Sequence, residues 1–478
     1  MANENDFVQH IASREEDFSR WYTDVILKTE LVDYSDVKGC MVIRPYGYGI
    51  WELIQKELDA RFKATGHKNA YFPLFIPESL LKKEAEHVEG FAPEVAMVTI
   101  AGNEELTERL VVRPTSETII CSMYAKWIQS YRDLPVLINQ WCNVVRWEKT
   151  TRPFLRTSEF LWQEGHTVHA TEEEAQAETM QMLNIYAEFV ENILAIPVIK
   201  GRKSEKEKFA GAAATYTMES MMQDGKALQM GTSHNLGQNF AKGFGIQFLD
   251  KDKQLKYGWQ TSWGVSTRMI GGIIMVHGDE RGLALPPKVA PIQVVILPIA
   301  QHKPGVLEKA GELAAKLRGA GLRVELDDRE GQSAGWKFNE WEMRGVPLRI
   351  EIGPRDIEAG QVVAVRRDEL QKRTLPLEGI EKAIPEILEE VHRGMYAKAK
   401  AFRDSKIITA VNFEEFTEGV KQGFVKAMWC GERECEDQIK EKTGASTRCM
   451  PFDQEEVAHT CVHCGKNAKH MMYFGKSY

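Results

Sequence analysis

The stretch from Arg146 to His166 reads RWEKTTRPFLRTSEFLWQEGH, and it sets the interpretation of the rest of the chain. It holds three arginines, four aromatic residues and three glutamates. The apolar run before it and the run that ends it predict two strands, which the polar loop KTTRP joins. Strand alternation places Arg146 and Glu148 on one face, with Trp147 opposite. Because an arginine on a rigid strand can bind a phosphate or a carboxylate, we predict a hairpin suited to a nucleotide.

A purely structural role fits the same residues. In that interpretation Arg146 and Glu148 form a cross-strand ion pair and the aromatic side chains belong to the core. The two common glycine-rich phosphate loops, GxGxxG and GxxxxGK[ST], do not occur in the sequence. A nucleotide would therefore have to be bound by side chains.

The composition is that of a large globular protein. The chain has 478 residues, of which 43% are hydrophobic and 27% charged, and its formal net charge is −8. This acidic balance gives no general attraction for nucleic acid or anionic membranes, so any contact with nucleic acid needs a local patch. The first residues lack the blocks of a secretory signal, and no apolar run approaches the ~20 residues that span a bilayer. We expect a cytoplasmic protein without a membrane partner.

The order of predicted elements divides the chain into three domains, at residues 1–285, 286–398 and 399–478. In the first, a helix over 51–65 precedes a strand over 70–76 and β-rich runs such as RLVVRPTS and MIGGIIMVHG. These features favour an α+β domain built on an antiparallel sheet. Prolines 286, 287 and 291 then mark a linker.

The two later domains have different patterns. After the linker, apolar runs such as IQVVILPI and PLRIEIG predict strands that alternate with helices over 306–321 and 335–345, an α/β arrangement. From about residue 399 the pattern changes again, and FEEFTEGVKQGFVKAMW (413–429) predicts a helix.

A group of cysteines near the end of the chain predicts a metal site. Cys430 and Cys435 are separated by four residues, and Cys461 and Cys464 by two. Two such pairs match a tetrahedral Cys₄ zinc site, which is structural because four thiolates leave no catalytic position. A cluster of free buried thiols is the alternative. Nearby substitutes as ligands are Cys449, His459 and His463.

The hairpin pattern R-x-E, a polar loop, R-x-x-x-F and a later glutamate resembles motif 2 of the class II aminoacyl-tRNA synthetases. Two further stretches agree with this resemblance. ATGHKNAYFPLF, which contains Pro73, resembles motif 1, a helix and strand that form the dimer interface in that family. GVSTRMIGG resembles motif 3, a glycine-rich strand and helix that carries Arg268.

Longer runs are more specific. RPTSE (113–117), KGRKSEKEKFAGA (200–212) and MGTSHNLGQNF (230–240) resemble the prolyl-tRNA synthetase family, in its shorter archaeal and eukaryotic-like type. The resemblance extends over almost the whole chain, to the terminal YFGKSY. Motifs 2 and 3 are only about a hundred residues apart, so the editing insertion of the long bacterial type, normally a whole domain, is missing.

The resemblance implies a class II catalytic domain, an α/β anticodon-binding domain and a small α+β zinc-binding C-terminal domain. It implies an aminoacyl-tRNA ligase that activates proline with ATP, accompanied by Mg²⁺, and transfers the prolyl group to the 3′ end of tRNA(Pro). The implied assembly is a homodimer. Tyr478 is implied to reach back toward the active site.

The family pattern also implies roles for single residues in catalysis. Thr115 and Glu117 would hold the imino nitrogen of proline, which offers two donors as a secondary ammonium. Arg146 would bridge the proline carboxylate and the ATP α-phosphate, and so offset charge that develops in the transition state. Arg268, the second catalytic residue, would hold the β- and γ-phosphates together with Arg156.

The other implied contacts fall into three sets. On the proline side they are Trp162, His234 and Phe91, although His234 also fits a structural histidine and Phe91 a core residue. On the ATP side they are Glu148, Arg156, Phe160, Gln229 and Thr232. For the two guanines of the proline anticodon they are Glu342, Arg349, Arg355 and Asp356, whose donors and acceptors suit guanine edges; the alternative is a solvated face of alternating charges.

Two other functions are weighed against this one. A synthetase-like RNA-binding protein without catalysis would be expected to lose Arg146, Glu148 or Arg268, and all three are present. A threonyl or glycyl relative is disfavoured by the RPTSE and SEFLWQEGHT runs, and a threonyl enzyme would also need zinc ligands in its active site. Without an editing domain, cysteine and alanine are predicted to be activated at a measurable rate.

Overall fold

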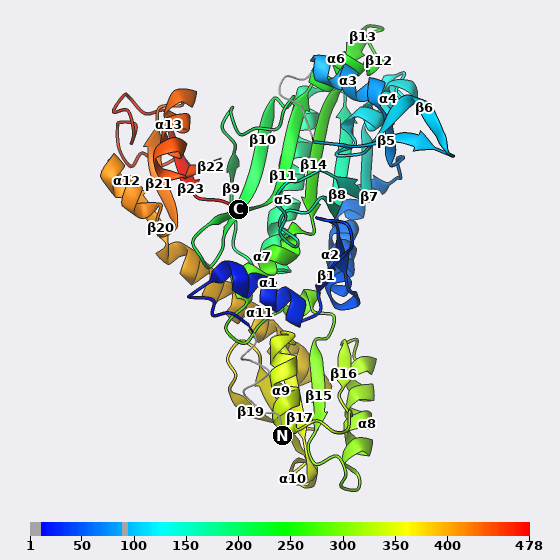
Figure 1. Ribbon diagram of the computed structural model, residues 1–478, viewed down its shortest axis with the longest axis vertical. Helices are drawn as coiled ribbons and strands as arrows, with labels where there is room; N and C mark the ends of the chain where they lie inside the picture. Colours follow the sequence, from blue (N-terminus) through cyan, green and yellow to red (C-terminus); the bar gives the residue numbers. More distant parts are fainter. Residues whose placement is uncertain (1–10, 88–93) are drawn as a thin grey trace.

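The computed structural model describes residues 11–87 and 94–478, and in this part of the chain an eleven-stranded sheet is the largest element (Figure 1). Neighbouring strands are antiparallel, except for the parallel pairs at its two ends, which confirms the predicted antiparallel sheet. In their order across the sheet the strands are β20 (Ile407–Ala410), β21 (Phe424–Trp429), β23 (His470–Gly475), β22 (Ser446–Pro451), β9 (Ile199–Arg202), β10 (Ala214–Met221), β11 (Ala227–Gly237), β14 (Trp259–Ser266), β8 (Glu159–His169), β7 (Val136–Val145) and β3 (Lys68–Asn69).

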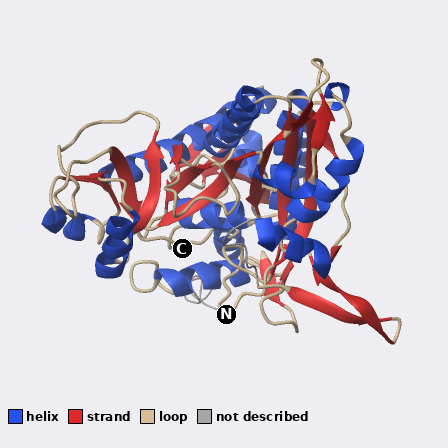
Figure 2. Cartoon of the chain, turned by 90° about the horizontal axis from the view of Figure 1, so that it is seen from above, coloured by secondary structure: helices blue, strands red, loops and turns tan. Residues whose placement is uncertain are grey.

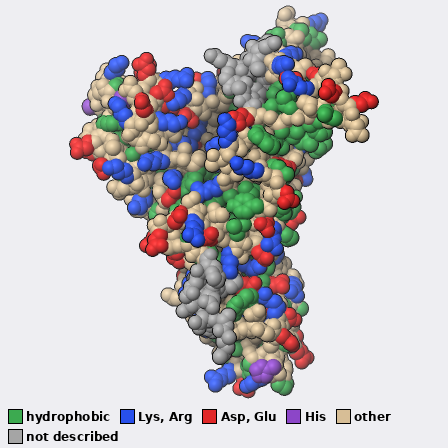
Figure 3. Space-filling model, in the orientation of Figure 1, with side chains coloured by type: hydrophobic (Ala, Val, Ile, Leu, Met, Phe, Trp, Pro, Cys, Tyr) green, Lys and Arg blue, Asp and Glu red, His purple; other side chains and the backbone are tan. Residues whose placement is uncertain are grey.

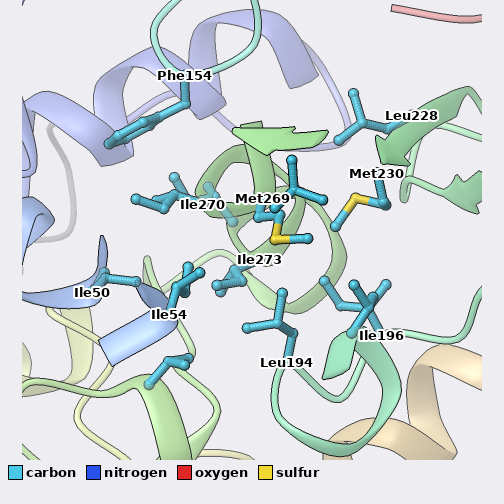
Figure 4. Close-up of a cluster of buried hydrophobic side chains, with 14 of the residues drawn as sticks. Ile50, Ile54, Phe154, Leu194, Ile196, Leu228, Met230, Met269, Ile270 and Ile273 are labelled. Atoms are coloured by element: carbon cyan, nitrogen blue, oxygen red, sulfur yellow. The ribbon is translucent and has the colours of Figure 1, made fainter. Parts of the chain in front are cut away.

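A large apolar core lies against the middle of this sheet. The helices that contribute to it are α1 (Phe18–Lys28), α2 (Pro45–Ala64), α5 (Glu172–Asn192) and α7 (Arg268–His277). In α2 the apolar residues Ile54, Leu58 and Phe62 recur every four positions, so they share one buried face, as predicted. Side chains of α2, α7 and β11 meet in the cluster of Figure 4. Each buried aliphatic side chain stabilises the fold by roughly 1.5–3 kcal/mol.

Smaller elements surround the large sheet and its core. A three-stranded sheet of β4 (Phe75–Pro77), β6 (Glu104–Val112) and β5 (Ala96–Ala101) projects from it, as Figure 1 shows. The remaining elements are β1 (Val32–Tyr34), β2 (Met41–Ile43), α3 (Glu78–His87), α4 (Glu117–Trp127), α6 (Asn239–Phe244), β12 (Gln247–Leu249), β13 (Leu255–Tyr257) and 3₁₀ turns at Tyr131–Asp133 and Pro287–Val289.

The second domain is a five-stranded sheet with helices, in the predicted α/β arrangement. The first three strands in spatial order are parallel and the last two are antiparallel additions. That order is β16 (Val324–Leu326), β15 (Val294–Pro298), β17 (Leu348–Ile352), β18 (Gln361–Arg366) and β19 (Lys372–Pro376). Its helices are α8 (Val306–Gly319), α9 (Ala334–Met343), α10 (Pro354–Glu358) and α11 (Ile380–Ser405).

The C-terminal part extends the eleven-stranded sheet. Its strands β20 to β23 pack with α12 (Phe413–Gly419) and α13 (Arg433–Thr443), and seen from above they lie at the left of the molecule (Figure 2). Strand β22 pairs with β9, which joins the two parts into one sheet. The predicted domain border at residues 398 and 399 falls inside the continuous helix α11.

Three predicted elements differ from the structure. MIGGIIMVHG forms helix α7, because Gly271 and Gly272 let this apolar helix approach Leu155 and Met230 closely. The predicted strand over 70–76 is a strand only from Phe75, since Pro73 interrupts the run. The predicted helix over 413–429 ends at Gly419 and continues as the buried strand β21.

In the described residues there is no helix with the length and apolar character to cross a membrane.

Candidate active site

A cavity of about 340 Å³ opens between the loop before α4 and the strands β8, β10, β11 and β14. It collects most of the predicted site residues in one place, although they come from distant parts of the sequence. Those that line it are Thr115, Glu117, Arg146, Phe160, Trp162, Gln229, Thr232, His234 and Arg268. Phe91 lies outside the described residues.

Arg146 is held firmly at the end of β7. Its backbone N–H donates to the Ser158 carbonyl (2.8 Å), and its Nε donates to the Pro114 carbonyl (3.0 Å). The guanidinium carbon lies 5.6 Å from the centre of the Phe160 ring and 5.4 Å from that of Trp162. Burial lowers the pKa of Arg146, but a guanidinium stays charged in proteins. The cavity therefore contains a fixed, oriented cation.

Two more arginines, Arg268 and Arg156, were predicted for this site. Arg268 begins α7, where its Nη2 donates to the Leu155 carbonyl (3.1 Å) and its backbone N–H to Ser266 Oγ (3.2 Å). Burial, followed by the charge of Arg156, lowers the pKa of Arg268. Arg156 pairs with Glu148 at 3.4 Å, and neither lines the cavity.

The segment before α4 contributes a hydroxyl and a carboxylate. Thr115 Oγ1 donates to Glu117 Oε2, and both side chains are buried. Arg113 anchors the segment, because its guanidinium donates to the Asn143 carbonyl and Oδ1 (2.7 Å each) and to the Phe72 carbonyl (2.8 Å). An ammonium group in the cavity would meet two acceptors here.

His234 of β11 is a neutral side chain of the cavity wall. Its Nδ1 and Nε2 lie 2.9 and 3.1 Å from the Thr215 and Thr232 hydroxyls. Its ring lies 4.7 Å from the ring of Phe209, centre to centre. Burial, and then the charge of His166, lower the pKa of His234 to about 3.

The sequence predictions missed Glu164 and His166, which also line the cavity and are buried. Glu164 Oε1 lies 2.7 Å from His166 Nε2, while its Oε2 accepts hydrogen bonds from Ser116 Oγ (2.8 Å) and Trp162 Nε1 (3.1 Å). Burial alone would raise the pKa of Glu164, but the bond and charge of His166 lower it below the usual carboxyl range. For His166 the contributions of Glu164 outweigh burial and raise the pKa. The signal was available, since residues 162, 164 and 166 share one face of a strand.

Three family models match the chain. They describe a class II tRNA synthetase core domain (G, H, P, S and T) over residues 98–277, an anticodon-binding domain over 293–387 and a C-terminal prolyl-tRNA synthetase domain over 413–478. The proline–tRNA ligase of Alkaliphilus oremlandii is 66% identical over 477 residues, or 99% of each chain. That of Ruminiclostridium cellulolyticum is 64% identical over the full length of both chains. The chain belongs to the prolyl-tRNA synthetase family.

A solved structure gives the same result for the fold. The crystal structure of prolyl-tRNA synthetase from Cryptosporidium parvum, complexed with halofuginone and AMPPNP, has a TM-score of 0.94 and 44% sequence identity to this chain. The match covers all of this chain and 99% of that one. The predicted family and its three-part fold are thus confirmed.

The predicted anticodon residues of this prolyl-tRNA synthetase family member lie in the second domain. Arg349 Nη1 lies 2.7 Å from Glu342 Oε1, and Arg349 also pairs with Glu351 at 3.2 Å. Asp356 Oδ2 accepts from the Gly353 N–H (2.9 Å) at the start of α10, and Arg355 is exposed. The four side chains thus differ in how many of their hydrogen-bonding groups are already bonded within the protein.

The four predicted zinc ligands come together in the C-terminal part. Ligand atoms of Cys430, Cys435, Cys461 and Cys464 all lie within 4.8 Å of one another, and none forms a disulfide. Sulfur atoms around a tetrahedral zinc ion are about 3.8 Å apart, as follows from Zn–S bonds of about 2.3 Å. The cluster therefore fits a zinc ion, and Cys449 lies outside it.

The terminal Tyr478 lies near the hairpin loop. Its hydroxyl donates to Asp224 Oδ2 (2.5 Å), and its backbone N–H to the Ala227 carbonyl (3.2 Å). The guanidinium carbon of Arg152, in the loop of motif 2, lies 5.5 Å from the centre of its ring. The chain end thus contacts the loop that follows Arg146 and Glu148.

We predict that His234 makes the protein less stable as the pH falls. Below about pH 6.5 the histidine of the unfolded chain takes up a proton, but the folded one, with a pKa of about 3, does not. From pH 7 to pH 5 this group should lower the free energy of unfolding by about 2 kcal/mol. Urea unfolding at both pH values measures the loss. In a His234→Asn variant, which cannot titrate, the loss should be smaller by that amount, and equal losses would contradict the assignment.

Proposed function

We propose that this chain activates proline with ATP to form prolyl-adenylate and then transfers the prolyl group to the 3′ end of tRNA(Pro). The position of Arg146 is the observation that carries this proposal. It lies in one cavity with two acceptors, Thr115 and Glu117, and a second buried cation, Arg268. These groups match a substrate pair that offers an ammonium, a carboxylate next to an α-phosphate, and further phosphates.

The amino end of proline would be held by Thr115 and Glu117. A secondary ammonium has two N–H donors, and a hydroxyl and a carboxylate that already contact each other can accept both. Trp162 and the neutral His234 would enclose the ring. Neutrality matters here because a charged imidazolium next to the pyrrolidine would have to be hydrated. Glu164 keeps Trp162 in place through the hydrogen bond from the indole N–H.

Arg146 would bind the proline carboxylate and the α-phosphate together. Both groups are anionic, and their repulsion opposes attack of the carboxylate oxygen on phosphorus. The P–O bond to that oxygen forms while the bond to pyrophosphate breaks, and the guanidinium stabilises the charge on the phosphoryl oxygens. No general base is required, because the carboxylate is already a nucleophile. Mg²⁺ would accompany ATP and neutralise its phosphates.

The adenine would stack on Phe160, with Glu148 accepting from its amino group. The Arg156–Glu148 pair is exposed enough to open, and Arg156 would then turn to the β- and γ-phosphates with Arg268. Gln229 and Thr232 of β11 would line the ATP side. In the second domain, Glu342, Arg349, Arg355 and Asp356 would read the guanines of the anticodon loop.

The first test is ATP–pyrophosphate exchange with each standard amino acid and no tRNA. We expect strong exchange with proline, and a fall of at least about 10²-fold in Arg146→Ala, because a preorganised charge on the reacting phosphate is lost. Arg132→Ala, which removes an exposed arginine elsewhere, should behave as wild type.

Other outcomes of this exchange assay separate the alternatives. Weak exchange with cysteine and alanine is expected, since one methylene discriminates by only about 1–3 kcal/mol. Strong exchange with a different amino acid would make the chain a sister enzyme. No exchange with any amino acid, and no charging of tRNA, would favour the RNA-binding alternative.

The cysteine cluster would hold a structural zinc ion. Four thiolates complete its coordination, so the ion would cross-link the loops around α13 and take no part in the reaction. We expect about one zinc per chain by elemental analysis, and loss of that zinc with a lower melting temperature in Cys435→Ser. Cys449→Ser is the matched control, because this buried cysteine lies outside the cluster. A zinc-free wild-type protein, or equal loss in both variants, would exclude the site.

A homodimer would form through the region of motif 1. Tyr71 and Phe75 flank Pro73, and their side chains are 72% and 45% exposed. Met97 and Ile100 are also exposed, on strand β5 of the three-stranded sheet to which Phe75 belongs. Hydrophobic side chains gather on this side of the molecule (Figure 3). Such a patch is typical of an interface.

Sedimentation tests this assembly. The wild-type protein should sediment as a dimer, and Phe75→Glu should shift it toward the monomer because a carboxylate would be buried without a partner. Leu307→Glu, an exposed leucine of α8, serves as control and should leave the dimer intact. A wild-type monomer at working concentration would rule the dimer out.

A further inference from the structure

Three charged side chains are buried together where the C-terminal part meets the catalytic sheet. Lys203 follows β9, Glu219 belongs to β10 and Arg448 to β22. Lys203 Nζ lies 2.9 Å from Glu219 Oε1, while Arg448 Nη2 and Nε lie 3.1 and 3.2 Å from Oε2. Their side chains are 3%, 0% and 8% exposed. Since buried charges lose their hydration, each of the three depends on the others.

Glu219 faces the same side of the sheet as the active site. In the register of β10 with β11, Glu219 is opposite Gln229, and Thr217 is opposite Thr232. Residues opposite each other share a face of a sheet, and both Gln229 and Thr232 line the cavity. Thr217 Oγ1 also donates to Glu219 Oε1 (3.0 Å), which agrees with this orientation. The charge cluster is thus a continuation of the ATP side of the cavity.

Electrostatics links the cluster to Arg268. After burial and the charge of Arg156, the carboxylate of Glu219 is the next influence on the pKa of Arg268, and Arg448 also contributes. Yet among the described residues the ion-pair partners of Glu219 are Lys203 and Arg448, and Arg268 donates to a backbone carbonyl instead. Gln229, which is opposite Glu219 in the sheet, lines the same cavity as Arg268, and the carboxylate of Glu219 is already paired with Lys203 and Arg448.

Arg448 is in this place because the C-terminal part docks closely. Strand β22 pairs with β9 at Met450–Arg202 and Pro451–Gly201. A Cβ on Gly201 would come within 2.2 Å of the Met450 carbonyl oxygen, so only glycine allows this approach. Beside it, Ser204 Oγ donates to the buried Glu436 of α13 (2.8 Å). The docking therefore fixes the backbone that carries Arg448.

We propose that Arg448 is a positioning residue for the ATP site: by pairing with Glu219 it prevents this carboxylate from capturing Arg268, which stays available for the phosphates of ATP. The proposal rests on the ATP role of Arg268 given above. With Arg448 in place, two cations share one carboxylate, so the cluster keeps one net positive charge beside the phosphates. Without Arg448, Oε2 of Glu219 is left without a cation, and we expect Arg268, a guanidinium of the cavity on the same face of the sheet, to take its place.

Steady-state pyrophosphate exchange on the full-length protein tests this mechanism. In Arg448→Met, which keeps an unbranched apolar stem, KM for ATP should rise at least about tenfold while KM for proline changes less than about twofold. The double variant Arg448→Met/Glu219→Gln should recover most of the ATP affinity, because a neutral amide does not compete for Arg268. Arg433→Met changes an exposed arginine of the same C-terminal part and should have no effect.

The outcomes separate this mechanism from a merely structural role. If the double variant is as weak as the single one, or if both KM values rise together, Arg448 only holds the domains and the proposal is wrong. Should Arg448→Met not fold, Glu219→Gln alone decides, because a tenfold rise in its KM for ATP would overturn the proposal. Absence of any exchange in the wild type would instead refute the proposed function, and AMPPNP binding by calorimetry would then compare the same variants.

Discussion

The pairing of β7 with β8 is the constraint on which the active site depends. In this register Val144 is opposite Phe160, Cys142 is opposite Trp162 and Gln140 is opposite Glu164. A strand has a period of two, so a slip by one residue would move the aromatic rings and Glu164 to the other face of the sheet. The hydrogen bond from Arg146 N–H to the Ser158 carbonyl extends the pairing at the loop end of the hairpin. The cation and the rings around it therefore keep one geometry only if this register holds.

The cavity combines charges that are fixed in advance with one neutral histidine. Glu164 and His166 each favour the charged form of the other, and Glu164 also accepts hydrogen bonds from Trp162 and Ser116 and so orients both. His234 is neutral because burial and the charge of His166 both oppose its protonation. Apart from His166, which is paired with Glu164, the cationic side chains that line the cavity are the arginines Arg146 and Arg268. Such preorganisation is how an enzyme stabilises a transition state without reorganising its own dipoles.

The sequence predicted local patterns well and their spatial combination less well. The helix of residues 51–65 was recognised because its apolar residues recur at helical spacing, which is typical of an amphipathic helix. Helix α7 was mistaken for a strand, because a short run of isoleucine, methionine and valine fits a buried strand as well as a buried helix. The pairing of β9 with β22 could not be predicted, since neither 199–202 nor 446–451 has a sequence pattern that indicates a partner strand more than 200 residues away.

The site residues, too, were predicted only in part. Arg146, Glu148 and Arg268 stood out by their spacing and by the family resemblance of the surrounding motifs. Glu164 and His166 lay in the same quoted stretch but were not assigned, because their importance appears only when Ser116 and Trp162 are seen to donate to one carboxylate. Glu219 was harder still to recognise. A glutamate within a buried strand indicates no particular function until the positions of its two cationic partners are known.

The second domain is connected to the catalytic part by ion pairs and backbone bonds rather than by a flexible linker alone. Arg367 donates to both carboxylate oxygens of Asp279 (2.7 and 2.6 Å), and the backbone of residues 283 and 285 bonds to that of 343 and 345. Arg281, just after Asp279, pairs with Glu342 at 2.6 Å. Glu342 thus pairs with Arg281 of the catalytic part and with Arg349 of its own domain. Through Arg281 it connects the second domain to the segment that follows α7, the helix that Arg268 begins.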